Sequence, residues 1–260
     1  MKYSLIFSIT LLFLPLITNG QIAGRQWQNH SCAVVLTYDD GLNVHLDKVI
    51  PSLDSVGLKG TFYIPANAAT IAARMDDWKR AAENGHELGN HTLFHPCSGS
   101  PAGREWVSPD YDLDTYTLRR FMDEIKVSNT VLKMIDGKEI RTFAYTCGDM
   151  KAGEDSFYEE IQNEFISARG VISRFENSNA DLFNIGAFMI NGQTGDQMID
   201  MVKQAMKSGS LLVFLFHGVG GEHSLNVDLN DHNRLVDFLK ANEKEIWVPT
   251  FLEVSQYLRK

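Results

Sequence analysis

Short apolar runs alternate with longer amphipathic stretches along most of the chain. The short runs are rich in β-branched and aromatic residues, which is typical of strands, whereas apolar residues spaced three or four apart are typical of helices. The pattern predicts strands at residues 33–38, 60–64, 87–90, 140–145, 165–168, 183–188, 211–216 and 246–249. It predicts helices at residues 45–56, 75–84, 113–134, 156–164, 198–207, 231–241 and 251–258.

Strands that alternate with helices indicate an α/β fold in which a parallel sheet is covered by helices, either a barrel or a doubly wound sheet. No Gly-x-Gly-x-x-Gly motif follows the first strand, which weakens a dinucleotide-binding interpretation. Polar residues cluster just after the strands, and in a barrel this places them all at one mouth. The pattern therefore favours a (β/α) barrel.

The N-terminus has the features of a secretory signal peptide. Lys2 precedes a mostly apolar stretch at residues 5–17, and small residues in 18–20 permit cleavage before Gln21. The alternative is an uncleaved N-terminal anchor. We expect a signal peptide at residues 1–20, a single catalytic domain at 21–260, and an exported protein in the periplasm or the extracellular space.

The composition narrows the range of partners. The formal net charge is −9 and basic clusters are absent from the sequence, so nucleic acid is a poor candidate ligand. The substrate should be neutral or cationic, and no stable protein partner is evident. The sequence has three cysteines and no Cys-x-x-Cys pair, so it gives little support to a zinc site formed by cysteines.

Three motifs whose side chains could bind a metal or take part in catalysis lie at the ends of predicted strands. Asp39 and Asp40 end the first strand, His91 and His95 follow the third, and His217 follows the run at 211–216. Each motif alone is also compatible with a structural role, such as a polar turn or a buried histidine. Together, one carboxylate and two imidazoles supply three ligands for a metal and leave a position for water, as catalytic zinc sites do.

The motifs TYDDG, HTLFH and LFHG, in this order, resemble those of the polysaccharide deacetylases, which form carbohydrate esterase family four. GTFYIPA and NGHELGNHT also resemble that family, and the similarity extends from about residue 33 to 258. The resemblance implies a distorted (β/α) barrel of seven or eight strands with a bound divalent metal, for which we expect Zn²⁺.

The resemblance also implies roles for individual residues. Asp40, His91 and His95 would be the metal ligands, Asp39 the general base and His217 the general acid. Water on the metal would be the nucleophile. The expected reaction is hydrolysis of N- or O-linked acetyl groups on an acetylated oligo- or polysaccharide.

The sequence departs from the family pattern at residues 141–149. Alignment on Gly148 places Ala144 where many members have an arginine that orients the catalytic aspartate. Arg141 is the candidate replacement, and the alternative is a charge at the surface or the barrel bottom. The same alignment makes the backbone N–H of Cys147 the expected oxyanion donor.

The aspartate that tunes the catalytic histidine in this family has no evident counterpart at residues 168–170. Asp181 and Asp196 are open alternatives for this role. Cys97 and Cys147 should both lie at the barrel mouth, and we hypothesise that a disulfide joins them there, with metal ligation as the weaker alternative.

Three further residues are candidates for substrate binding. Trp106 and Tyr111 lie in a long loop at residues 98–117, where they would either stack on sugar rings or pack the loop onto the barrel. His223 lies in a glycine-rich stretch, and the alternative for it is a solvated loop position.

Three other functions are compatible with parts of this pattern. A cyclic-amide hydrolase of the same superfamily would keep the fold, but export speaks against nucleobase salvage. A non-haem iron oxygenase also uses two histidines and a carboxylate, but usually on a β-sandwich. A non-catalytic carbohydrate-binding relative would not need both aspartates and all three histidines.

Overall fold

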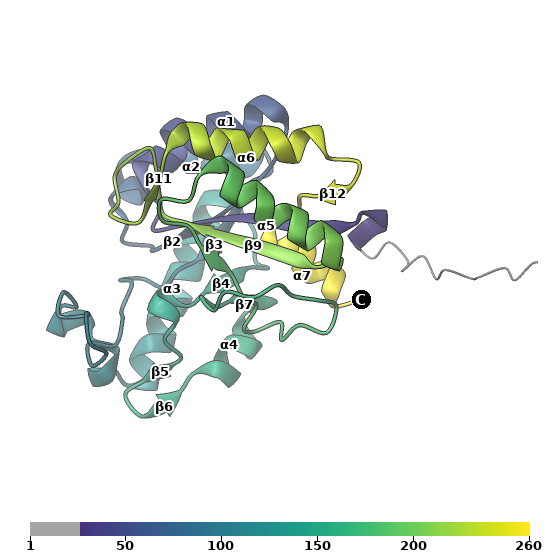
Figure 1. Ribbon diagram of the computed structural model, residues 1–260. Coiled ribbons are helices and arrows are strands. Elements are labelled where there is room, and N and C mark those ends of the chain that lie inside the picture. Colours follow the sequence, from purple (N-terminus) through teal and green to yellow (C-terminus); the bar gives the residue numbers. More distant parts are fainter. Residues whose placement is uncertain (1–26) are drawn as a thin grey trace, which may run out of the picture.

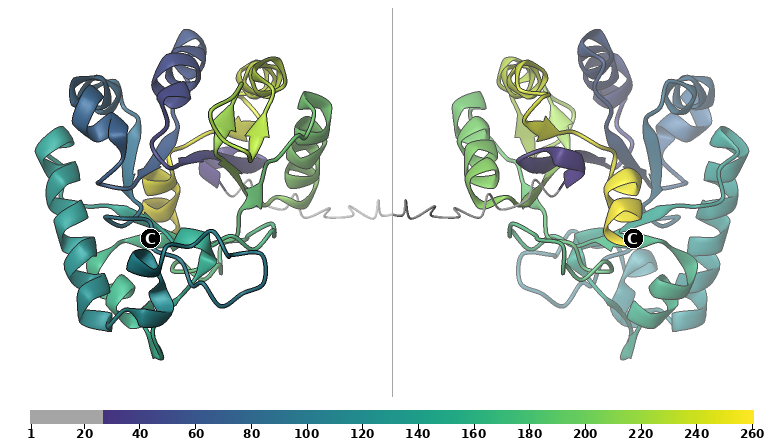
Figure 2. Two further views of the ribbon diagram at one scale, coloured as in Figure 1. Left: turned by 90° about the vertical axis from the view of Figure 1, so that its left-hand side faces the viewer. Right: turned by 90° about the vertical axis from the view of Figure 1, so that its right-hand side faces the viewer.

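The computed structural model describes residues 27–260, and the predicted signal peptide lies outside them. A parallel sheet curves round on itself, and most of the helices cover its outer face (Figures 1 and 2). The strands are β1 Cys32–Asp39, β2 Thr61–Ile64, β3 Glu87–Asn90, β4 Thr142–Ala144, β5 Lys151–Ala152, β6 Asp155–Ser156, β7 Ser167–Arg169, β8 Phe188–Met189, β9 Leu211–Phe216, β10 Gly218–Val219, β11 Asn226–Val227 and β12 Ile246–Trp247.

Within residues 27–260, eight strands form the main sheet in the order β7-β4-β3-β2-β1-β9-β8, and β12 pairs with the start of β1. Every pairing in this sheet is parallel. The architecture is the expected distorted (β/α) barrel. The barrel is irregular between β7 and β8, where residues 182–187 approach β7 through a few backbone hydrogen bonds instead of a full strand.

The helices follow the strands along the chain. They are α1 Ile50–Val56, α2 Ala69–Glu83, α3 Leu118–Asp136, α4 Tyr158–Glu164, α5 Gly195–Ser208, α6 Leu229–Ala241 and α7 Phe251–Leu258. The last of them, α7, lies inside the curve of the sheet (Figure 2). Its first turn is fixed by Phe251 N–H, which donates to the Thr61 hydroxyl (2.8 Å), and by Leu252 N–H, which donates to the buried Glu87 carboxyl (2.8 Å).

Alternation along β1 divides its side chains between two apolar clusters, because neighbouring residues of a strand face opposite sides. Val34, Leu36 and Tyr38 pack against the outer helices. Ala33 and Val35 pack inside the barrel with residues of β9 and α7. This two-residue period continues to the end of the strand and predicts that Asp39 faces the interior.

Most predicted elements are confirmed, and the differences lie at their ends. The predicted helix at 45–56 begins with a π-helical turn at His45–Val49. The predicted helix at 113–134 begins at Leu118, because the Thr117 side chain accepts a hydrogen bond from Arg120 N–H and caps it. The predicted strand at 183–188 was wrong for its first five residues.

Among residues 27–260, no helix combines the length and the apolar character that crossing a membrane requires.

Candidate active site

Asp39 ends β1 inside the barrel and is 3% exposed. Arg169, at the end of β7, is fully buried and donates from Nη2 to both carboxylate oxygens of Asp39, at 2.7 and 2.5 Å. Burial alone would raise the pKa of Asp39, but the Arg169 guanidinium and the imidazoles of His91 and His217 hold this pKa below its ordinary value. Asp39 is therefore ionised and fixed in one orientation.

The turn after β1 carries Asp40 in a left-handed conformation, with φ of 77°. Gly41 follows with φ of 61°, and a Cβ there would lie 2.7 Å from the Ile64 side chain, so only glycine fits. Thr70 holds the turn by donating its hydroxyl to the Gly41 carbonyl (2.5 Å). This turn separates the two carboxyl groups, so that Asp39 is buried while Asp40 is partly open.

The loop after β3 carries the two histidines. Asn90 accepts a hydrogen bond from Thr92 N–H (2.8 Å), and the Thr92 hydroxyl accepts one from His95 N–H (2.9 Å). Thr92 and His95 both have positive φ, 66° and 54°. Strained backbone of this kind is concentrated at functional sites because the surrounding structure must hold it in place.

Asp40, His91 and His95 converge, and the three candidate ligand atoms lie within 4.8 Å of one another. The Nε2 atoms of His91 and His95 lie 3.7 and 3.5 Å from Asp40 Oδ1. His91 Nδ1 bonds to the Ala144 carbonyl (2.9 Å), which leaves the lone pair on Nε2 facing the carboxylates. Burial lowers the pKa of His91 to about 4, although Asp39 opposes the shift, so this ring is neutral and able to bind a metal.

His217 follows β9 and lies on the same cavity as the two aspartates. Burial lowers the pKa of His217 below its ordinary value, against the opposing influence of Asp39 and Asp40. Its ring stacks on His223, with centroids 4.8 Å apart and planes 14° from parallel, and His223 Nε2 lies 3.8 Å from Asp40 Oδ2. His223 therefore lines the same cavity, with its side chain 31% exposed.

The residues meet in a cavity of about 320 Å³ at the carboxyl ends of the strands. Its polar floor is formed by the aspartates and histidines, and apolar side chains form much of its wall. The lining residues are Asp39, Asp40, His91, His95, Trp106, Tyr145, Cys147, Val171, Met189, Leu215, His217, His223 and Leu225. Trp106 is 64% exposed, so its ring is available to a ligand.

The prediction for Arg141 was wrong. Its guanidinium binds Asp136 (2.9 and 2.6 Å) and the carbonyls of Leu88 and Lys138, at the start of β4 and away from Asp39. Arg141 sits at the barrel bottom because it precedes β4, whereas the site lies at the other end of the strands. The structure gives the contact with Asp39 to Arg169 instead.

Tyr111 is also not part of the cavity lining. It stacks on Phe94, with ring centroids 5.1 Å apart, and so packs its loop as the alternative interpretation held. Asp181 accepts from the Tyr158 hydroxyl, and Asp196 pairs with Arg234. His217 Nδ1 is buried without a hydrogen-bond partner among the described residues, so neither aspartate orients it.

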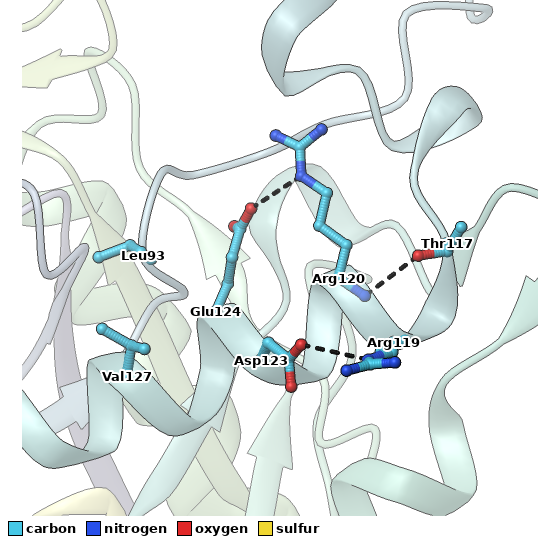
Figure 3. A pocket seen from close by; sticks show the side chains of 7 residues that line it. All are labelled: Leu93, Thr117, Arg119, Arg120, Asp123, Glu124 and Val127. Carbon is cyan, nitrogen blue, oxygen red and sulfur yellow. Dashed lines mark hydrogen bonds and ion pairs between the residues drawn. The ribbon is translucent and has the colours of Figure 1, made fainter.

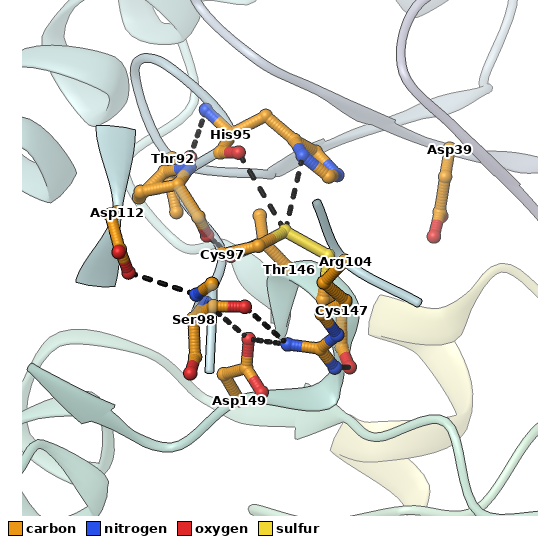
Figure 4. The surroundings of a disulfide bond; sticks show 12 residues. Asp39, Thr92, His95, Cys97, Ser98, Arg104, Asp112, Thr146, Cys147 and Asp149 are labelled. Carbon is orange, nitrogen blue, oxygen red and sulfur yellow. Dashed lines mark hydrogen bonds and ion pairs between the residues drawn. A yellow bond between two sulfur atoms is a disulfide. The ribbon is translucent and has the colours of Figure 1, made fainter. Parts of the chain in front are cut away.

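The hypothesised disulfide is present: Cys97 and Cys147 are bonded, with Cα atoms 5.8 Å apart (Figure 4). It joins the histidine loop to the turn at Thr146–Gly148. Arg104 reinforces the junction by donating to Asp149 (2.5 Å) and to the Cys147 carbonyl (3.0 Å). The two loops that border the cavity are therefore held together covalently.

A second hollow lies on the outer face of α3 and contains no histidine (Figure 3). Its charged side chains pair with each other, Arg119 with Asp123 (3.7 Å) and Arg120 with Glu124 (3.3 Å). Figure 3 shows these pairs beside the apolar side chains of Leu93 and Val127. The arrangement offers no counterpart to the cluster of aspartates and histidines in the barrel cavity.

The functional residue that sequence reasoning missed is Arg169. The signal was present, because Arg169 stands at a strand end beside Gly170, where the family alignment expects an aspartate. The family resemblance by itself marks this position only as the loss of that aspartate. The ion pair spans 130 residues and crosses the barrel from β7 to β1, which no local pattern reveals.

A family model described as polysaccharide deacetylase matches residues 28–169, more than half of the chain. The chain therefore belongs to the polysaccharide deacetylase family. Its curved parallel sheet and the cluster of aspartates and histidines at the carboxyl ends of the strands agree with that assignment.

Individual relatives are distant. The peptidoglycan-N-acetylmuramic acid deacetylase PdaA of Bacillus subtilis is 28% identical over 107 residues, which cover 41% of this chain and 34% of PdaA. The chain thus spans about a third of the length of the curated relatives it matches.

Solved structures share the fold. A protein assigned as a polysaccharide deacetylase from Mycobacterium smegmatis superposes with a TM-score of 0.60 at 13% identity, covering 88% of this chain and 91% of that one. A family 4 acetyl xylan esterase from Clostridium thermocellum, in complex with a cobalt ion, gives 0.53 at 21% identity, covering 86% and 90%.

Proposed function

We propose that this protein is an exported, metal-dependent hydrolase that removes acetyl groups from a carbohydrate. The observation that carries the proposal is the convergence of Asp40, His91 and His95 beside Asp39 and His217 in one cavity. Membership of the polysaccharide deacetylase family supports the reaction class. The Cys97–Cys147 disulfide supports export, since such bonds persist in oxidising compartments.

The three candidate ligands suit a divalent cation, and we propose Zn²⁺. Two imidazole nitrogens and one carboxylate oxygen form a typical catalytic zinc set, and they leave a coordination position open. When bound, the cation would polarise the acetyl carbonyl and lower the pKa of water. The acetyl xylan esterase with a cobalt ion supports a divalent metal in a protein of this fold.

The chain's own residues would move the protons. Asp39, ionised and held by Arg169, would accept the proton of the attacking water. His217, across the same cavity, would donate a proton to the departing nitrogen or oxygen. The backbone N–H of Cys147, on the cavity wall, remains our proposal for the oxyanion donor.

The cavity supports an acetylated oligo- or polysaccharide as substrate. The exposed Trp106 ring and the apolar wall formed by Val171, Met189 and Leu225 suit the apolar faces of sugar rings. PdaA is named for action on a peptidoglycan amino sugar and the esterase for acetyl xylan, so both linkages belong in the assay panel.

Metal removal tests the proposal directly. We expect acetate release from acetylated xylan or chitooligosaccharides, its loss with a chelator, and recovery on adding Zn²⁺. Asp40→Ala should weaken metal binding by more than about 100-fold, because even indirect supporting groups contribute 10–100-fold to metal affinity. Titration calorimetry measures this, and Asp196→Ala, a surface carboxylate, is the control. Unchanged metal affinity in Asp40→Ala would refute the ligand assignment.

Trp106 and Tyr111 give a matched test of substrate binding. Trp106→Ala should raise KM about fivefold, equivalent to about 1 kcal/mol of lost stacking, with little change in kcat. Tyr111→Ala, in the same loop but outside the cavity, should leave KM within about twofold of wild type. Equal KM changes in both variants would show that the loop acts as a whole instead.

A further inference from the structure

The imidazole ring of His95 has a potential metal-binding atom of another residue on each side. Nε2 faces Asp40 Oδ1 at 3.5 Å. Nδ1 faces Cys97 Sγ at 3.7 Å (Figure 4). Each ring nitrogen therefore faces a different set of metal-binding atoms. We propose that reduction of the disulfide creates a second metal site, formed by His95, Cys97 and Cys147, which takes His95 away from the site of the proposed function.

The geometry of the second site suits zinc. The ligand atoms of His95, Cys97 and Cys147 lie within 4.8 Å of one another. With ordinary Zn–N and Zn–S bond lengths and a tetrahedral angle, the nitrogen and sulfur ligands of one zinc ion lie about 3.6 Å apart. The observed separation of 3.7 Å between His95 Nδ1 and Cys97 Sγ is already close to that value. Only the two sulfur atoms need to separate once their bond is broken.

Cysteine thiolates are soft ligands, and they are among the side chains that bind zinc well. Cys97 is 1% exposed and Cys147 lines the cavity, so one cysteine is shielded while the other borders the cavity. Arg104, which donates to the Cys147 carbonyl and to Asp149, keeps the two cysteine-bearing loops together without the covalent bond. The pair should therefore stay close enough to bind one ion.

The two sites exclude each other. A neutral imidazole carries one N–H and one lone pair, so it binds one metal ion at a time. In the oxidised protein the sulfur atoms are bonded to each other, Nδ1 keeps its hydrogen, and Nε2 remains available beside Asp40. In the reduced protein, ligation through Nδ1 moves the hydrogen to Nε2, which then points toward Asp40 as a donor.

The redox step is a two-electron exchange with a dithiol. The S–S bond between Cys97 and Cys147 breaks and two S–H groups form, while the two S–H groups of the dithiol become a disulfide. Metal binding then displaces the two cysteine protons to solvent. The predicted consequence is that the chain, once reduced, holds its metal on the thiols and becomes active again only after reoxidation.

Cobalt absorption tests this separately from catalysis, because thiolate ligands give Co²⁺ a sulfur-to-metal charge-transfer band that nitrogen and oxygen ligands do not. All proteins carry Cys32→Ala, which removes the buried free thiol. Co²⁺ is titrated anaerobically into the full chain, oxidised or reduced with a phosphine. The reduced protein should bind one Co²⁺ with the band, the oxidised protein should show none, and acetate release should fall on reduction.

Two variants sharpen the result. His91→Ala destroys the first site, so the oxidised variant should lose Co²⁺ while the reduced variant keeps the charge-transfer band. The Cys97→Ser/Cys147→Ser double variant lacks both the bond and the thiols, and should bind Co²⁺ without the band whether or not it is treated with phosphine.

The proposal is overturned if the reduced protein lacks the band, if His91→Ala abolishes it, or if the reduced Cys32→Ala parent binds two Co²⁺ ions per chain. The inference rests on the proposed function only for its effect on activity. If the oxidised protein binds no Co²⁺, the proposed function fails, and the charge-transfer result for the reduced thiols still decides the second site.

Discussion

Asp39→Asn is expected to lower kcat by a factor of about 10² to 10⁴, the usual contribution of a general base, while the protein keeps its metal. The amide cannot accept the proton that the proposed mechanism assigns to Asp39. The metal remains because the proposed ligands are Asp40, His91 and His95. Initial rates on an acetylated oligosaccharide and a metal titration of the same preparation measure the two effects.

The buried position of Asp39 calls for a stability control. Asp39→Asn leaves Arg169 buried without its counter-ion, which costs about 3–5 kcal/mol in comparable pairs. The Asp39→Asn/Arg169→Met double variant removes both charges and should be more stable in urea unfolding than the single Asp39 variant, yet equally inactive. A double variant that regains activity would show that Asp39 acts only through stability.

Arg169→Met is expected to move the acid limb of the pH–activity profile to higher pH. Burial raises the pKa of Asp39 and Arg169 opposes it, so without the guanidinium this carboxyl should protonate at higher pH. A base works only when ionised, so activity should be lost earlier as the pH falls. The same variant should lose about 3–5 kcal/mol of folding free energy, because Asp39 becomes a buried charge without a partner.

Arg141→Met is the matched control for this experiment. Arg141 is also a buried arginine paired with a buried aspartate, Asp136, but at the opposite end of the barrel. It should destabilise the protein by a similar amount and leave the acid limb of the profile in place. Equal shifts in the two variants would mean that the profile reports unfolding and not the protonation of Asp39.

Much of the fold and the candidate site followed from local pattern. The run at 211–216 matches β9, because this signal depends on neighbouring residues only. The motifs at strand ends were brought together because parallel strands share one carboxyl edge. The disulfide was also predicted once both cysteines were assigned to that edge.

The arginine prediction failed for a specific reason. β4 consists only of Thr142–Ala144, so alternation gives little basis for deciding which way a residue just before it points. Arg141 is held by Asp136 and the Lys138 carbonyl, both within five residues, and by the Leu88 carbonyl of β3. Arg169 reaches Asp39 because the barrel curves β7 toward β1, although three strands lie between β7 and β1 in the sheet.

The sequence by itself determined the alternating elements, the strand ends that carry Asp39, Asp40, His91, His95 and His217, and the family resemblance, because these depend on residue type and short-range spacing. Only the tertiary structure decided which arginine pairs with Asp39 and that His223 stacks on His217. It also decided that the His95 ring faces a carboxylate on one side and a sulfur atom on the other. The contacts of Arg169 with Asp39 and of His95 with Asp40 join residues from different strands and loops, and curvature of the sheet, which no local pattern encodes, brings them within reach.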